Sequence, residues 1–214
     1  PLAPLHNPHH LSAIDALAAL MPELPQFAAF DTGFHRTNPD VARRYALPEK
    51  PETAALSRYG FHGISYESLA RNFTAQTGAP LPDRLLALHL GNGVSLCAIR
   101  EGRSVATTMG FSPLGGLTMG TRAGEIDAGA VLHLVGDLGL EAAQRLLHHE
   151  SGLLGLSGQT ADMRQLAESD SEAARFARAH FCYWITRQAG SMIAAMGGID
   201  GIAFTGGIGE NDSA

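Results

Sequence analysis

The turn Gly91-Asn92-Gly93 constrains the fold of this chain more than any other feature. Residues 85–90 and 94–100 are short apolar runs on either side of it. Asn-Gly between two such runs is typical of a β-hairpin. Strands followed by helices along the rest of the chain favour an α/β domain. Glycine costs conformational entropy in ordered structure, so the many glycines between Asn92 and Arg122 indicate tight turns or a close approach of the backbone to another group.

Apolar spacing predicts the other elements. The longest helix is expected over residues 172–196, with Ser169 and Glu172 at capping-box spacing and Gly197-Gly198 at its end. Ser12 is the expected N-cap of an earlier helix. Further helices are expected within residues 11–21, 37–50, 125–139 and 140–150 and after Gly63, and strands within residues 26–31 and before the glycine-rich turn at 206–209.

Composition excludes several classes of protein. The 214 residues suffice for one large domain or two small ones, and a net charge of −6 argues against a general nucleic-acid binder. No apolar run is long enough to span a membrane, and no signal peptide is visible. Cys97 and Cys182 form no CxxC pair, so we expect a reducing, cytoplasmic compartment, no structural zinc, and both thiols in the core.

Two glycine-rich turns are candidate phosphate sites. The backbone N–H groups of Gly91-Asn92-Gly93 can form a nest for phosphate oxygens, although the turn taken alone is better explained as an ordinary hairpin turn. The turn Gly206-Gly207-Ile208-Gly209 follows a strand, as nucleotide-binding turns often do. Its spacing matches neither the GxGxxG fingerprint nor a Walker A loop, so alone it is a weak signal.

Three side chains are candidates for chemistry. Asp31 ends an apolar run and could hold Mg²⁺ through water or phosphate, or cap the next turn. Arg122 suits a transferring phosphoryl group because it is always charged, or it pairs with Glu125 or Asp127. His62 lies in a glycine-flanked loop and is either functional or a hydrogen-bonded core histidine. No HExxH, Cys/His set or GxSxG elbow is present, which argues against a zinc enzyme or a serine hydrolase.

Seven motifs, taken together and in order, resemble the acetate kinases and their propionate and butyrate kinase relatives. They are "PLAPLHNP", "FDTGFHRTNP", "RYGFHGISY", "HLGNGVSLCAI", "MGFSPLGGLTMGTRAGEID", "SGLLGLSGQTADMR" and "FTGGIGEN". The chain looks like about the middle half of such a kinase. The resemblance implies the actin-like ATPase fold, with two ribonuclease-H-like domains around a cleft. It also implies phosphoryl transfer between ATP and acetate, giving acetyl phosphate and ADP with Mg²⁺ or Mn²⁺, in a homodimer.

The resemblance also implies roles for individual residues. Residues 1–33 would end the N-terminal domain and form the hinge, and residues 34–214 would belong to the C-terminal nucleotide-binding domain. The implied catalytic residues are Asp31, His62 and Arg122, with Asp31 also near the metal; the implied substrate-binding residues are Leu5, His6, Phe61 and Pro113. The implied ATP-binding residues are His89, Gly91, Asn92, Gly93, Asp162, Met163, Arg164, Gly206, Gly207, Ile208, Gly209 and Asn211.

The chain departs from the family pattern in what it lacks. The first strand with its glycine-serine turn, a second arginine and the glutamate that is the main metal ligand are absent from it. Gly33, Arg36 and Glu125 replace the usual alanine, glutamine and aspartate. A propionate or butyrate kinase, a non-catalytic nucleotide-binding protein of the same fold and an α/β metal-dependent hydrolase remain as alternatives. We expect the 214-residue chain alone to be inactive.

Overall fold

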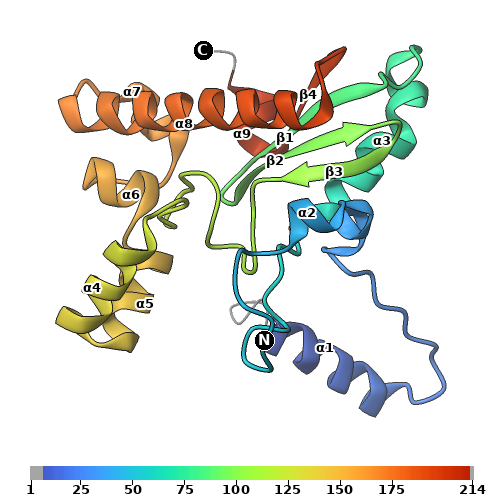
Figure 1. The fold of residues 1–214 in the computed structure, drawn as a ribbon, viewed down its shortest axis with the longest axis horizontal. Coiled ribbons are helices and arrows are strands. Elements are labelled where there is room, and N and C mark those ends of the chain that lie inside the picture. The colour runs from blue at the N-terminus through green and yellow to red at the C-terminus, as the bar shows by residue number, and fades with distance from the viewer. Residues whose placement is uncertain (1–6, 213–214) are drawn as a thin grey trace.

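The centre of the molecule is a four-stranded mixed sheet in the order β3-β2-β1-β4 (Figure 1). The computed structural model describes residues 7–212. β1 (Arg84–Leu90) and β2 (Val94–Arg100) pair antiparallel, with Leu90 opposite Val94, so the predicted hairpin is confirmed. β3 (Arg103–Thr107) continues the antiparallel order, and β4 (Gly201–Thr205) runs parallel to β1 at the other edge.

Helices cover both faces of this sheet, as Figure 1 shows for α8 and α3. The helices preceding the sheet are α1 (Asn7–Leu20), the 3-10 helix η1 (Gly33–Thr37), α2 (Asp40–Arg43) and α3 (Gly63–Thr77). Those following β3 are α4 (Ala128–Leu138), α5 (Leu140–His149), α6 (Gly152–Ser157), α7 (Met163–Glu168), α8 (Glu172–Met196) and α9 (Gly206–Asn211). Helix α8 has the bounds that the apolar spacing predicts.

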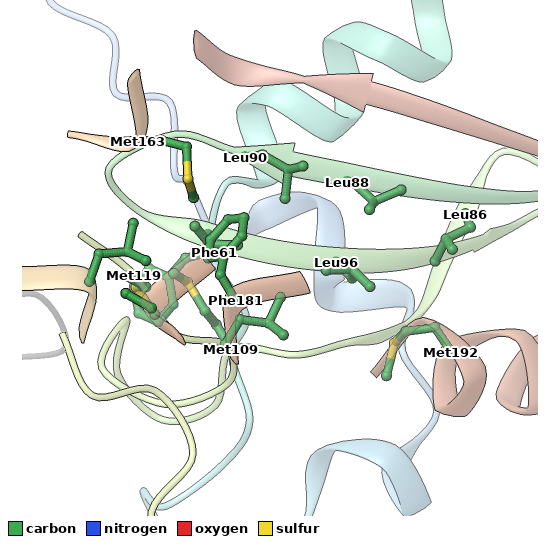
Figure 2. Close-up of a cluster of buried hydrophobic side chains, with 14 of the residues drawn as sticks. Phe61, Leu86, Leu88, Leu90, Leu96, Met109, Met119, Met163, Phe181 and Met192 are labelled. Carbon is green, nitrogen blue, oxygen red and sulfur yellow. The ribbon is translucent and has the colours of Figure 1, made fainter. Parts of the chain in front are cut away.

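The core divides into two clusters, one on each face of the sheet. On the α8 side, Leu86, Leu88 and Leu96 pack with residues that include Phe181 and Met192 (Figure 2). On the α3 side, the buried side chains are Tyr66, Leu85, Ala87, Cys97 and Ile99. Because both faces are covered, β1 and β2 read as nearly continuous apolar runs rather than as an alternating pattern.

Several local expectations are wrong. Residues 26–31 form no strand, and Phe27 and Phe30 are 94% and 74% exposed, because no described strand pairs with this extended run. Helix α1 begins at Asn7, so Ser12 lies inside it rather than capping it. Cys182 is exposed on the outer side of α8, whereas Cys97 is buried as expected.

Three further differences concern the start of α8, the helix α9 and the strand β3. The N-cap of α8 is Ser171, whose side chain accepts from the backbone N–H of Ala174; Ser169 instead accepts from the backbone N–H of Ser171. The glycine-rich segment after β4 forms α9 rather than an open turn. Strand β3 was not expected, because a Glu101-Gly102 turn is a weaker hairpin signal than Asn-Gly.

Within residues 7–212, no helix combines the length and the apolar character that crossing a membrane requires.

Candidate active site

His62 stands at the first turn of α3, where Asp31 holds it. The backbone N–H of His62 donates to Asp31 Oδ2 at 2.8 Å, and the N–H of Gly63 donates to the Asp31 carbonyl oxygen at 2.8 Å. His62 itself has a left-handed backbone with φ of 58°, which is uncommon outside glycine and is often found at functional sites. Asp31 therefore caps the start of α3. This is one of the two roles, capping or holding Mg²⁺, that its position in the sequence allows.

The imidazole of His62 lies in a hydrogen-bonded and aromatic setting. Its Nδ1 is 2.8 Å from Ser95 Oγ on β2, and Ser95 Oγ is 2.5 Å from the Tyr66 hydroxyl on α3. The ring also lies against the ring of His89, with centroids 4.1 Å apart. Desolvation, with smaller contributions from His89 and Arg122, lowers the pKa of His62 to about 3. The imidazole is consequently neutral at physiological pH.

Arg122 lies on the long loop between β3 and α4. Its Nη1 donates to the Pro113 carbonyl oxygen at 2.7 Å. Among the described residues it forms no ion pair with Glu125 or Asp127, so the alternative of a local salt bridge is wrong. Burial lowers the pKa of Arg122, but a guanidinium remains charged in proteins. Its positive charge is therefore available to an anionic ligand.

The hairpin turn brings His62 and Arg122 together. A Cβ placed on Gly93 would lie 3.0 Å from His62 Nε2 and 3.2 Å from Arg122 Nη2. Both nitrogens thus reach the same few ångströms of space beside the turn, although the residues are 60 positions apart in the sequence. A side chain at position 93 would crowd both nitrogens.

Asn92 connects the turn to the glycine-rich loop. Its carbonyl oxygen accepts from the Gly120 N–H at 3.1 Å, and a Cβ on Gly120 would lie 2.2 Å from Asn92 Oδ1. A side chain at position 120 would therefore collide with the amide. Gly120 therefore permits the close packing of this loop against the turn, and Gly116 permits a second close approach, since a Cβ there would lie 2.8 Å from the Thr108 carbonyl oxygen.

A cavity of about 630 Å³ opens next to Asn92. The start of α7 and the helix α9 form its other walls, and Asp162 Oδ1 caps α7 by accepting from the Arg164 N–H at 2.9 Å. The predicted nucleotide-binding residues that line it are Gly91, Asn92, Asp162, Met163, Arg164, Gly207, Ile208 and Asn211. Ala161, Ala167 and Asp212 also line it, and no sequence signal marked these three.

Other predicted residues lie elsewhere. His89 and Gly93 lie beside His62 rather than in the lining of this cavity, and Gly206 and Gly209 pack against Leu90. Phe61 is buried in the core cluster of the α8 side, and Pro113 is buried beside Arg122. Leu5 and His6 lie outside the described residues.

The described residues offer little for direct metal binding. Within residues 7–212, no three His, Cys, Asp or Glu side chains gather as a metal site. Asp31 is a single carboxylate, and its Oδ2 already accepts from the His62 N–H. Magnesium commonly keeps several waters and binds through one or two carboxylates plus phosphates. Asp31 therefore fits a contact through water and not a complete metal site.

Sequence patterns missed the buried residues behind His62. Ser95 and Tyr66 are fully buried, and His35 is 1% exposed. His35 Nε2 donates to the Phe61 carbonyl oxygen at 2.9 Å, and its Nδ1 is 2.8 Å from Ser104 Oγ. A serine inside an otherwise apolar strand was the available signal for Ser95, since a buried hydroxyl needs a partner.

Over residues 1–214, the sequence matches the model of the acetokinase family. The chain belongs to the acetokinase family. An acetate kinase of Rhodopseudomonas palustris (strain ATCC BAA-98 / CGA009) is 51% identical over 99% of this chain and 54% of its own length. The chain spans about half the length of the curated relatives it matches.

Solved structures of acetokinase-family enzymes share the fold. The acetate kinase of Porphyromonas gingivalis gives a TM-score of 0.88 at 37% identity, over 97% of this chain and 54% of that one. A propionate kinase from Francisella tularensis subsp. tularensis SCHU S4 gives 0.90 at 36% identity, over 98% and 56%. The predicted ribonuclease-H-like, actin-like ATPase fold is thereby confirmed.

Proposed function

We propose that the whole protein is an acetate kinase, which transfers a phosphoryl group between ATP and acetate. In the forward direction, a carboxylate oxygen of acetate attacks the γ-phosphorus of ATP. The bond between that phosphorus and the β,γ-bridging oxygen breaks, and ADP leaves with the electron pair. The products are acetyl phosphate and ADP. The observation that carries this proposal is the convergence of His62 Nε2 and Arg122 Nη2 beside the Asn92 turn.

Two features of these groups suit phosphoryl transfer. Such transfer needs in-line positioning and charge stabilisation more than covalent help from the protein. Arg122 brings a guanidinium that stays positive, which opposes the charge on the equatorial phosphoryl oxygens. A neutral His62 can form a hydrogen bond with the phosphoryl group. It carries no additional proton that the reaction would have to remove. The Pro113 carbonyl oxygen accepts a hydrogen bond from Arg122 Nη1 at 2.7 Å, which holds the guanidinium in position.

The nucleotide would occupy the cavity beside Asn92. This cavity adjoins the hairpin turn and borders the backbone of Gly207 and the cap of α7 at Asp162. Its volume of about 630 Å³ is within the range of small-molecule sites. ATP held there with its phosphates toward Asn92 would direct the γ-phosphate to Arg122. When bound, Mg²⁺ would neutralise phosphate charge, with Asp31 contributing through water.

The domain division is also a proposal. Residues 34–214 contain the whole described sheet together with His62, Arg122 and the cavity beside Asn92, whereas the described part of residues 1–33 contains no strand. We assign residues 1–33 to the end of a preceding domain and the hinge, with Asp31 between the two. A second copy of the chain is the expected partner in a homodimer.

A propionate kinase is the second candidate, because one of the similar solved structures is a propionate kinase. Butyrate is a further possible acceptor. The test is a steady-state assay of the whole protein with Mg-ATP and acetate, propionate or butyrate. The highest kcat/KM with acetate supports the proposal. A higher value with propionate or butyrate makes it a kinase for that acid, and nucleotide binding without turnover would make it a non-catalytic member of the fold.

A further inference from the structure

The hydrogen of the Tyr66 hydroxyl has one acceptor in the structure. Tyr66 is fully buried, and its hydroxyl oxygen lies 2.5 Å from Ser95 Oγ, which is the only side-chain hydrogen bond that it makes within residues 7–212. A backbone hydrogen bond with His89 lowers the pKa of Tyr66. A lowering of this kind is expected when the backbone N–H donates to the phenol oxygen, so this contact does not take the Tyr66 hydrogen. Burial raises the same pKa well above its ordinary value, so Tyr66 keeps its hydrogen and gives it to Ser95.

The hydrogen of Ser95 is then directed to His62. Ser95 is fully buried, and besides Tyr66 its hydroxyl contacts His62 Nδ1 at 2.8 Å. A hydroxyl donates one hydrogen and accepts others. Ser95 Oγ could accept from both Tyr66 and His62, but its own hydrogen would then be buried without an acceptor among the described residues, so that hydrogen goes to His62 Nδ1. The reverse order would leave the Tyr66 hydrogen buried without an acceptor, which costs free energy.

An imidazole that accepts at Nδ1 and is neutral carries its hydrogen on Nε2. Nε2 is also the nitrogen that lies beside Arg122 at the Gly93 position. We propose that Tyr66 and Ser95 are positioning residues that hold His62 in its Nε2–H form, so that an N–H donor faces the cleft next to the Arg122 guanidinium. The consequence for turnover depends on the proposed kinase function, whereas the position of the hydrogen does not.

Two donors side by side suit an anion better than a donor beside an acceptor. With the hydrogen on Nδ1 instead, Nε2 would present a lone pair to the oxygens of a phosphoryl group and repel them. The Nε2–H form and Arg122 can both donate to such oxygens. Ser95 and Tyr66 do not touch the reacting atoms, and they act through His62 alone.

The direct test is two-bond ¹H–¹⁵N correlation spectroscopy of the whole protein labelled with [¹⁵N]histidine, at pH 7 and without ligand. The His62 signals are assigned by their loss in His62→Asn. His35 is the internal reference, because its Nε2 faces the Phe61 carbonyl oxygen, which can only accept. We expect the hydrogen of His62 on Nε2, as in His35. A hydrogen on Nδ1 overturns the proposal.

Variants test the positioning role. Tyr66→Phe lets the Ser95 hydroxyl either donate or accept, so we expect a mixture of the two forms of His62, and Ser95→Ala gives the same result by removing the donor. Ser95→Thr is the control for Ser95→Ala: it keeps the hydroxyl, so His62 should stay in the Nε2–H form. If both Tyr66→Phe and Ser95→Ala retain the Nε2–H form alone, the two residues do not set it and the proposal fails. Should Ser95→Ala not fold, Tyr66→Phe decides the matter.

Kinetics supply the second measurement. We expect Tyr66→Phe to lower kcat in proportion to the Nε2–H fraction lost in the spectra, by about twofold for an equal mixture, while the Kd for ATP stays unchanged, because only the Nε2–H form offers the second donor. If the whole protein shows no phosphoryl transfer, the proposed function fails while the spectra still decide the form of His62. If spectra shift as expected but kcat is unchanged in an active kinase, the Nε2–H form is not used in catalysis, and that part of the proposal is overturned.

Discussion

The carboxylate of Asp31 accepts a hydrogen bond from the backbone N–H of His62 at 2.8 Å, across 31 positions of sequence. This contact gives Asp31 a structural role as a cap of α3, next to the metal-side role that the family resemblance implies. The two roles respond differently to substitution, because a cap needs an acceptor oxygen and a metal-side group needs negative charge.

We predict that Asp31→Asn keeps most of the cap and loses the charge. The free energy of unfolding should fall by less than about 0.5 kcal/mol in Asp31→Asn and by about 1 kcal/mol in Asp31→Ala. Turnover should fall strongly in both. Urea unfolding and steady-state assays of the whole protein check this. Full activity in Asp31→Asn would show that the charge has no part in the reaction.

We predict that Arg122→Ala lowers kcat by about 10³-fold or more, because charge stabilisation of the transferring group is lost. Nucleotide affinity should change little. Arg145→Ala is a matched control, since Arg145 is an exposed arginine that pairs with Glu150 on the surface. Arg122→Ala that loses ATP binding but keeps turnover would contradict the role assigned to the guanidinium.

We predict that Gly93→Ala lowers kcat by about 10- to 100-fold, because small displacements of reacting groups are costly. The added methyl would lie 3.0 Å from His62 Nε2 and 3.2 Å from Arg122 Nη2 and push them apart. Gly136→Ala is the control, because a Cβ at this position in α4 meets nothing within 4 Å. Comparable activity in the two variants would show that the space beside Gly93 is not part of the site.

We predict that stability falls in mild acid partly because of His62. Its pKa is lowered from 6.5 to about 3 in the folded state, so the unfolded chain takes up the proton first as the pH falls. The corresponding stability is present above pH 6.5 and is lost progressively toward pH 3. Burial lowers the pKa of His35, His89, His148 and His180 as well, which adds to the same trend.

The measurement is urea unfolding of the protein and of His62→Asn at pH 7.5 and pH 5.5. Asparagine tolerates the left-handed backbone at this position. The variant should lose less stability between the two pH values than the parent. An equal loss in both proteins would mean that His62 is not held neutral by the fold.

We predict that the 214-residue chain on its own binds ATP weakly and does not make acetyl phosphate. The resemblance implies that a second arginine and a metal-binding glutamate are required, and that both lie outside these 214 residues. The measurement is acetyl phosphate formation by the purified chain with Mg-ATP and acetate. Turnover within tenfold of an intact acetate kinase would refute the prediction.

The sequence by itself determined the elements whose causes are local. The Gly91-Asn92-Gly93 turn specifies the hairpin through the backbone freedom of its residues, and apolar spacing with the terminal Gly197 specifies α8. Motif order also identified the family, because seven short motifs in one order are far more specific than any one of them. Each of these signals is contained within a short stretch of chain.

Only the tertiary structure decided what depends on distant contacts. An apolar run such as residues 26–31 becomes a strand only if a neighbour pairs with it, and the described chain provides none. The meeting of His62 with Arg122 depends on the Gly93 turn lying between them, and the contact of His62 with Ser95 spans 33 positions. Hydrogen-bond direction and pKa follow from burial, which is a property of the packed chain and not of the residue type.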